Sequence, residues 1–307
     1  MPTLKYYLSF WYIKIFAYLF LFILLIIAIS LTPIKYSHLT LNELLNRIIA
    51  YLINFLLLFI PLITVEYFSG NNIFKIYGLS NFHKFLKYFV HTFFVISLLF
   101  SSIVFANYLL DNCASNLDKF LIETTLLVNL TIIFIAALQE ELIFRGFLIN
   151  SLELRFSATS SIVLSSIIFA LLHILNANFS MLAALNTFLA GLLLGLLYVQ
   201  SRSIWLPVLY HFFWNAMIPL LLNSNVSGIN FDYSIFVINQ SKFQPILNGG
   251  DYGFEGTISA TLIVILSIFY FIKIETLNPY NSSYKFMKKF ELESYLLKNE
   301  TKNIEQI

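Results

Sequence analysis

Eight long apolar runs most restrict what this chain can fold into. They cover roughly residues 9–31, 48–67, 88–110, 120–141, 158–175, 180–199, 204–222 and 256–274. A helix needs about 20 apolar residues to cross the hydrocarbon core of a bilayer, and its backbone groups must then pair within the segment. The runs therefore predict an all-α, multi-pass membrane protein with about eight transmembrane helices.

The composition agrees with a membrane-embedded domain. Hydrophobic residues make up 59% of the 307 positions and charged residues only 11%, against about 25% charged in soluble domains. We assign residues 1–277 to one integral membrane domain, with a motif-bearing core at about 120–222, and residues 278–307 to a basic cytoplasmic tail. The first run lacks the small-residue cleavage site of a signal peptide, so we predict a retained helix.

The distribution of positive charge predicts the orientation. With the N-terminus inside, fourteen of the eighteen lysines and arginines lie on the cytoplasmic side and four outside. The positive-inside rule then places both termini in the cytoplasm, with the protein in the inner or plasma membrane. The polar connection at about 223–255 falls outside, either as a lid or as a loose loop. A net charge of +2 is too small to indicate a nucleic-acid partner, and the single cysteine, Cys113, excludes an internal disulfide.

The octet QEELIFRG at residues 139–146 places three charged side chains between apolar segments. Charged groups at membrane depth are costly and usually mark a working site. We expect the helix of the fourth run to continue through the octet to about Leu154. On that helix Glu141 and Arg145 share a face and pair, which leaves Glu140 to face a cavity as a general base. The alternative is an ion-paired triad that only holds helices together.

Two later apolar runs each carry a histidine four positions away from a second residue of interest. His173 follows Phe169 by four positions in FALLH, and His211 precedes Asn215 by four in HFFWN. Residues four apart lie on the same helix face. Ordinary packing is the alternative for His173, with the asparagines that follow it as partners. Interhelical hydrogen bonding is the alternative for His211 and Asn215.

Other catalytic signatures are absent from the sequence. It has no HExxH zinc motif, no GxSxG elbow and no glycine-rich phosphate loop. Thr187, Gly191 and Gly195 form a small-residue ridge that we interpret as tight packing against a neighbouring helix. What remains is a base, two imidazoles and an amide donor, which are the groups needed to hydrolyse an acyl bond.

The ordered motifs EExxxR, FxxxH and HxxxN, each in a separate apolar run, resemble those of the CAAX protease and bacteriocin-processing family. This family is also called the abortive-infection family and includes the type II CAAX prenyl endopeptidases. The resemblance covers about residues 139–215 and agrees with the family's eight-helix core. It implies an intramembrane endopeptidase with a polar catalytic cavity between helices four, five and seven.

The resemblance also implies a role for each motif residue. Glu140 would activate water for attack on a peptide carbonyl, supported by Glu141 and Arg145. His173 would position water or substrate.

His211 and Asn215 would stabilise the oxyanion. Members of the family have been called metalloproteases, and Glu140, His173 and His211 would suffice for an open zinc site. We favour a glutamate mechanism that requires no cofactor, and both accounts use the same residues.

The function that we expect is hydrolysis of a peptide bond in a membrane-associated protein or peptide, near the cytoplasmic side. Prenylated CAAX proteins are the eukaryotic substrates of the family, and peptide maturation or immunity fits a bacterial source. The alternative is a non-catalytic membrane scaffold or bacteriocin-immunity protein that keeps the polar cluster for assembly. A proton-coupled carrier would use the same groups as a relay, but the paired broken helices typical of carriers do not occur in the sequence.

Helix geometry predicts different depths in the membrane for side chains that should share one site. At 1.5 Å per residue, Glu140 and His173 lie roughly 21–23 Å from the predicted cytoplasmic ends of their helices, whereas His211 lies only roughly 10 Å from its own. A tilted or recessed seventh helix would bring these side chains together.

The charge asymmetry makes a prediction about topology. A reporter fused after Ile307 and a second reporter in the 223–255 connection should report opposite sides of the membrane, with Ile307 in the cytoplasm. A paired alkaline phosphatase and fluorescent-protein fusion assay measures this. If both positions report the same side, the eighth span or the assignment of the connection is wrong.

Overall fold

The computed structural model describes residues 4–30, 43–80, 85–109, 113–115, 124–231, 234–238 and 249–273, and the predicted tail at 278–307 lies outside them. The described helices are α1 (Leu4–Tyr7), α2 (Trp11–Ser30), α3 (Glu43–Phe68), α4 (Ile73–Ile76), α5 (Phe85–Leu109), α6 (Thr124–Glu141), α7 (Asn150–Leu152), α8 (Ala158–His173), α9 (Met181–Ser201), α10 (Trp205–Leu222) and α12 (Ile258–Lys273). A π-helix covers Leu142–Ile149, short 3₁₀ turns cover Gly250–Tyr252 and Phe254–Gly256, and β1 (Cys113–Ser115) pairs antiparallel with β2 (Phe236–Ile238).

The long helices lie where the apolar runs predict them, and the chain is a helical integral membrane protein. Five segments of the described chain are long and apolar enough to cross a membrane, namely Ile48–Phe68, Phe85–Phe105, Leu126–Leu152, Met181–Ser201 and Trp205–Leu222. The other three runs correspond to shorter apolar helices at Trp11–Leu25, Ala158–His173 and Ile258–Lys273. The fold class is confirmed, whereas a count of eight crossings stays a prediction.

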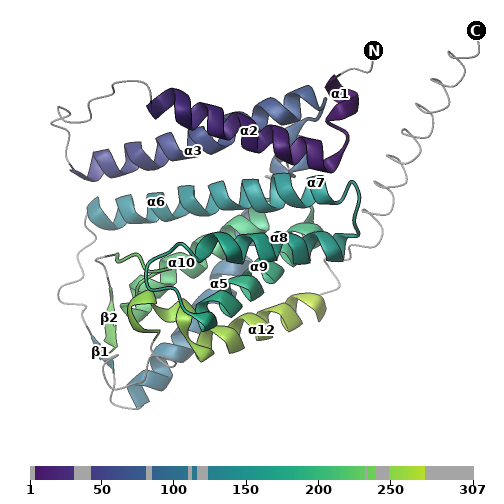
Figure 1. Cartoon of the computed structure of the whole chain (residues 1–307). Coiled ribbons are helices and arrows are strands. Elements are labelled where there is room, and N and C mark those ends of the chain that lie inside the picture. The colour runs from purple at the N-terminus through teal and green to yellow at the C-terminus, as the bar shows by residue number, and fades with distance from the viewer. Residues whose placement is uncertain are drawn as a thin grey trace, which may run out of the picture.

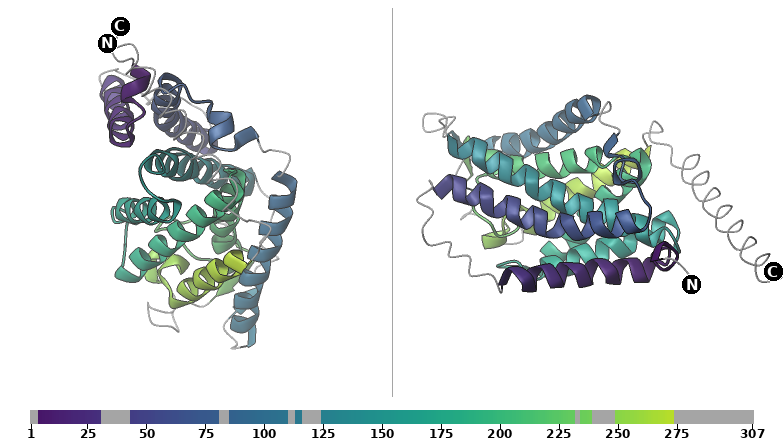
Figure 2. Two further views of the ribbon diagram at one scale, coloured as in Figure 1. Left: turned by 90° about the vertical axis from the view of Figure 1, so that its right-hand side faces the viewer. Right: turned by 90° about the horizontal axis from the view of Figure 1, so that it is seen from above.

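The helices form a bundle in which α6 occupies the middle. Figure 1 shows α2 and α3 on one side of α6, and α8, α9, α10, α12 and α5 on the other; the end-on view in Figure 2 shows the same order. Exposed apolar side chains such as Phe16, Phe20, Leu98 and Leu172 lie on the outside of the bundle, where lipid would cover them. The polar side chains of the three motifs lie within the second group of helices and α6.

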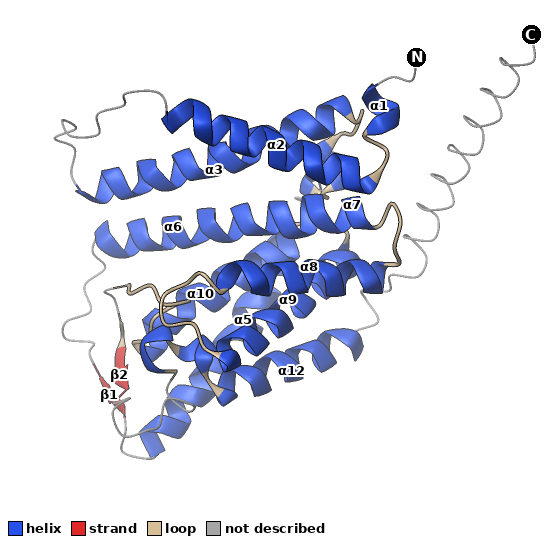
Figure 3. Cartoon of the chain, in the orientation of Figure 1, coloured by secondary structure: helices blue, strands red, loops and turns tan. Residues whose placement is uncertain are grey.

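The two ends of the bundle differ in structure. The strands and the segments 223–231 and 249–257 lie at one end, which we call the β1–β2 end (Figure 3). At the other end, which we call the α4 end, lie α1, α4, α7 and the end of α12. Leu4 and Lys273 are therefore on the same side of the bundle, as the predicted topology requires. The assignment of that side to the cytoplasm stays a prediction.

The segment after α4 covers the beginning of α10. The backbone N–H of Ile204 donates to the Tyr77 carbonyl at 3.0 Å, and the Trp205 indole donates to the Leu79 carbonyl at 3.0 Å. Gly78 adopts φ +69°, and a Cβ there would lie 2.2 Å from the Arg202 carbonyl oxygen, so only glycine fits this crossing. Residues 77–79 thus cover the start of α10. The motif residues meet despite their different distances from the helix ends, since His211 Nδ1 lies 2.8 Å from Glu141 Oε1.

The glycine ridge on α9 packs as the sequence predicts. A Cβ at Gly191 would lie 2.9 Å from the Ser166 Cβ on α8, and one at Gly195 would lie 2.9 Å from Ile162. Small residues let two membrane helices approach closely, because their attraction depends on van der Waals packing. This contact fixes α8, which carries His173, against α9.

A second buried ion pair, which the sequence analysis did not identify, joins α2 and α3. The Lys14 ammonium lies 2.7 Å from the Glu66 carboxylate, and Asn71 and the Tyr77 hydroxyl donate to the same carboxylate. Burial, together with the adjacent Glu66 carboxylate, raises the pKa of Tyr77, so its hydroxyl remains a donor. The ammonium also faces the ring of Phe147 at 5.6 Å, which connects this cluster to the π-helix.

Candidate functional site

The helix that carries the paired glutamates changes type directly after them. The prediction of a continuous helix is correct as far as Leu152, but α-helix ends at Glu141 and residues 142–149 are π-helical. π-helical turns inside α-helices are rare and occur frequently at functional sites. The wider turn follows the glutamates immediately, so the motif EExxxR begins on an α-helix and ends on a π-helix.

Arg145 is buried to 1% exposure and makes contacts on three sides. Its Nη1 donates to Glu141 Oε1 at 3.0 Å, and its Nη2 donates to the Gly191 carbonyl on α9 at 3.3 Å. Its guanidinium lies 4.7 Å from the centre of the Phe169 ring on α8. The predicted pairing of Glu141 with Arg145 is confirmed, and the arginine connects the π-helix to two further helices.

His211 joins α10 to both glutamates. Its Nδ1 donates to Glu141 Oε1 at 2.8 Å, and because a carboxylate only accepts, this bond fixes the proton on Nδ1. Its Nε2 lies 3.9 Å from Glu140 Oε2, too far for a direct hydrogen bond. A water molecule between these two atoms would be within hydrogen-bonding reach of both.

Glu140 differs from its neighbour in its surroundings. The Glu140 side chain is 32% exposed and that of Glu141 is fully buried. The Glu140 Oε2 atom is buried but accepts no hydrogen bond from the described residues. The prediction that Arg145 neutralises Glu141 and leaves Glu140 free agrees with this arrangement.

His173 lies at the end of α8 and takes its proton position from its own helix. Its Nδ1 donates to the Phe169 carbonyl at 2.8 Å, which leaves Nε2 as the atom available to a ligand or water. The packing alternative predicts the following asparagines as partners of the ring, but in the described part of the chain the ring bonds to Phe169 instead, and the backbone N–H of Asn176 donates to the His173 carbonyl. The centre of the ring lies 4.4 Å from that of the Phe169 ring, and the two planes are tilted by 49°.

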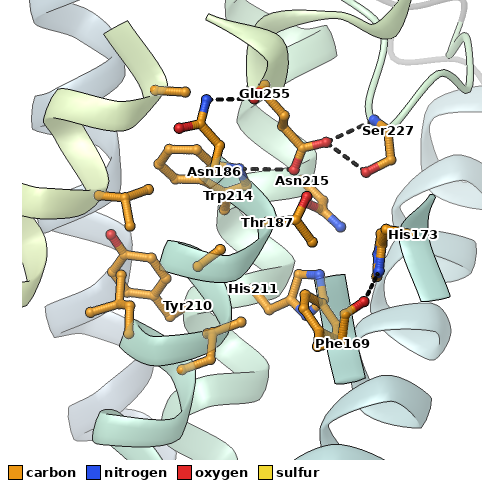
Figure 4. A pocket seen from close by; sticks show the side chains of 15 residues that line it. Phe169, His173, Asn186, Thr187, Tyr210, His211, Trp214, Asn215, Ser227 and Glu255 are labelled. Carbon is orange, nitrogen blue, oxygen red and sulfur yellow. Dashed lines mark hydrogen bonds between the residues drawn. The ribbon is translucent and has the colours of Figure 1, made fainter. Parts of the chain in front are cut away.

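A single pocket brings together His173, His211 and Asn215 (Figure 4). With its open mouth it encloses about 590 Å³. Asn215 Oδ1 is buried there and has no hydrogen-bonding partner among the described residues. Glu140 does not line this pocket, so the prediction that it faces the cavity is wrong for this pocket. Its Oε2 lies 3.9 Å from Nε2 of His211, which does line the pocket.

The prediction of a cavity between helices four, five and seven is wrong for the fourth helix, since no residue of α6 or of its π-helical continuation lines the pocket. The wall is formed by α8 and α10 together with α9, α12 and residues from the connection between α10 and α12. The sequence analysis missed the polar lining residues Asn186, Tyr210, Trp214, Ser227 and Glu255. Asn186 could have been found from the sequence, because a polar side chain inside an apolar run is the same signal that identified the glutamates. Glu255 comes at the edge of a polar connection, where no pattern distinguishes it.

The connection between α10 and α12 closes the pocket at the β1–β2 end. We call residues 224–228 and 250–257 the plug. Ser224 Oγ accepts from the Phe254 N–H, and Gly228 N–H donates to the Tyr252 carbonyl. On α9, Asn186 Nδ2 donates to the carbonyls of Glu255 and Thr257 at 2.8 Å each.

The sequence predicts either a lid or a loose loop for this connection, and these hydrogen bonds distinguish the two. The plug segments of the connection are hydrogen-bonded to each other and to α9, so they are not a loose loop. The pocket lies next to them, at the end of the bundle opposite Leu4 and Lys273. Under the predicted topology this is the outer side, so the expectation of cleavage near the cytoplasmic side does not follow from the structure.

The nominal zinc ligands do not form a metal site in this arrangement. Within the part of the chain that the structure describes, no three His, Cys, Asp or Glu side chains are grouped to hold a metal ion. A tetrahedral zinc site needs three such groups with ligand atoms about 2 Å from one point. We therefore derive no step through a metal.

Removal of Arg145 should destabilise the protein. In Arg145→Ala, Glu141 and the Gly191 carbonyl lose their partner, and breaking a buried pair costs roughly 3–5 kcal/mol. We expect a lower folded yield and a lower midpoint of thermal unfolding in detergent. Arg155→Ala is the matched control, because Arg155 is exposed. Equal stability of the two variants would contradict the structural role of Arg145.

Comparison with known proteins gives a result that agrees with the geometry. Residues 122–217 match the family model described as type II CAAX prenyl endopeptidase Rce1-like. A search of the curated proteins found no match to the chain. The matched stretch includes all six candidate residues, from Glu140 to Asn215, and the family resemblance inferred from the three motifs is confirmed. The segment that builds the polar centre of this membrane protein is therefore the part that is similar to the Rce1-like family.

Proposed function

We propose that the protein is an intramembrane endopeptidase in which Glu140 activates water. The matched family is one of endopeptidases, and the observation that carries the specific proposal is the different surroundings of the two adjacent glutamates. Glu141 is fully buried and paired with Arg145, whereas the Glu140 side chain is 32% exposed and its Oε2 lies 3.9 Å from His211 Nε2. A carboxylate without a cationic partner beside an imidazole nitrogen is suited to accept a proton from water.

In the proposed hydrolysis Glu140 is the base and Asn215 is the oxyanion donor. A water held between Glu140 Oε2 and His211 Nε2 loses a proton to Glu140 as its oxygen attacks the carbonyl carbon of the peptide. The carbonyl oxygen becomes the oxyanion, and the Asn215 amide donates to it. When the C–N bond breaks, the proton on Glu140 passes to the leaving nitrogen. Water is consumed, and a carboxylic acid and an amine are released.

The remaining polar residues hold this centre in place. Glu141 fixes the ring of His211 through the 2.8 Å bond, and Arg145 compensates the charge of Glu141. His173 presents Nε2 to the pocket because Nδ1 is occupied by the Phe169 carbonyl. Positioning by supporting residues of this kind lowers the barrier, since the reacting groups need no reorganisation.

The substrate class that we propose is a peptide or protein at the membrane. The pocket lies within the helices and has both apolar walls, such as Leu193, Leu194 and Val264, and polar ones. A non-catalytic scaffold or immunity protein is the alternative, and the same ion pairs would serve it. The two functions differ in whether Glu140 is needed for turnover.

Glu140→Gln should abolish hydrolysis of a quenched peptide library by the purified protein in nanodiscs, while folding is retained. The substitution keeps the shape of the side chain and removes only the base. The matched control is Glu153→Gln, since Glu153 pairs with Arg202 at the α4 end and should leave turnover in place. Comparable rates in wild type and Glu140→Gln would disprove the mechanism.

Asn215→Ala should lower kcat by roughly 10²–10³ with little change in KM, because an oxyanion donor acts mainly in the transition state. Kinetics of this variant should be measured beside metal analysis of the purified wild type. Asn215 is a poor zinc ligand, so a metal mechanism predicts a milder loss. Stoichiometric zinc that is removed and restored together with activity would overturn the metal-free proposal.

A further inference from the structure

Glu255 is a carboxylate on the pocket wall that the proposed chemistry does not use. It belongs to the plug, where its backbone carbonyl accepts from Asn186, while its side chain points into the pocket that also contains His211 and Asn215. Figure 4 shows its carboxylate on the same side of the pocket as Asn215. A substrate held at Asn215 would therefore come close to this charge.

The groups that hold the Glu255 carboxylate are all neutral. Its Oε1 accepts from the Trp214 indole at 3.2 Å, and its Oε2 accepts from the backbone N–H and the hydroxyl of Ser227, each at 2.7 Å. These three donors fix the direction of the carboxylate. They do not compensate its charge, since none of them is a cation.

Glu255, like Glu140, has no lysine or arginine partner among the described residues, whereas three other glutamates of the bundle do. Glu66 is paired with Lys14, Glu141 with Arg145, and Glu153 with Arg202. Across the described ranges, no lysine, arginine or histidine nitrogen lies within ion-pair distance of Glu255. A half-buried anion of fixed direction on a pocket wall is suited to a cation supplied by a ligand, because charges attract more strongly in a site of low dielectric constant.

We propose that Glu255 binds a lysine or arginine side chain of the substrate, close to the scissile bond. Glu255 and Asn215, the proposed oxyanion donor, line the same side of the pocket (Figure 4), so a substrate bound at Asn215 would place a neighbouring side chain beside the carboxylate. This assignment rests on the proposed function and deepens it, because it gives the peptidase a preference for a basic residue. The apolar residues Leu193, Leu194 and Val264 line the same pocket and would contact the neighbouring side chains.

The test uses N-acetylated, quenched peptides, so that a free terminal ammonium cannot replace the basic side chain. Lysine, arginine or norleucine is placed in turn at each position around the cleaved bond, and kcat/KM is measured for the full chain in nanodiscs. At one position we expect lysine and arginine to exceed norleucine by at least about tenfold. Glu255→Gln should reduce this ratio to about one. Asp251→Asn is the matched control, since it removes a carboxylate charge of the plug that does not line the pocket, and it should retain the ratio.

A second readout does not need turnover. Binding of the lysine and norleucine peptides to Glu140→Gln, followed by fluorescence anisotropy, should give the same ratio in Kd, and Glu140→Gln combined with Glu255→Gln should remove it. Equal kcat/KM and equal Kd for lysine and norleucine at every position would overturn the proposal. So would an equal loss for both peptides in Glu255→Gln, which would mark a purely structural residue. Hydrolysis that is unaffected by Glu140→Gln would instead disprove the proposed function, and the binding ratio would still decide the role of Glu255.

Discussion

The site depends on the burial of one arginine. Arg145 compensates Glu141, holds the Gly191 carbonyl and lies against Phe169, so it joins the π-helix to α9 and α8 at a single point. An isolated charge at membrane depth is costly, and the pairing offsets that cost for two residues together. Glu141 then fixes His211 on α10. Arg145 and Glu141 together thus hold the π-helix, α8, α9 and α10 around the polar centre.

The surroundings of the two adjacent glutamates explain why they can have separate roles. The rotation of about 100° between adjacent helix positions directs Glu141 into the ion pair and Glu140 towards His211 Nε2. Both carboxylates would have similar surroundings in a fully exposed segment. Here the first partly faces open space and the second is fully enclosed, so neighbouring positions can serve as the proposed base and as a structural anion. The π-helix that follows gives the segment its unusual turn directly behind them.

Contacts far from the motifs hold the helix that carries His211. Residues 77–79 cover the beginning of α10, and His211, the seventh residue of that helix, contacts Glu141. The pair of Lys14 and Glu66, with Tyr77 donating to Glu66, holds this covering segment beside α2 and α3. The N-terminal helices thus support the site without contributing a residue to the pocket.

The sequence by itself determined the helical membrane fold and the identity of the motif residues. Apolar runs long enough to span a bilayer have few other stable conformations, and charged or imidazole side chains in such runs need partners, so they can be found without a structure. The pairing of Glu141 with Arg145 follows from spacing within one helix. Only the tertiary structure decided the partners that lie far apart in sequence, such as His211 with Glu141, Arg145 with Gly191, and Glu255 with Ser227. Helical periodicity fixes the face on which a side chain lies but not the helix that packs against that face. For the same reason the contributions of α9, α12 and the plug to the pocket could not be read from the sequence.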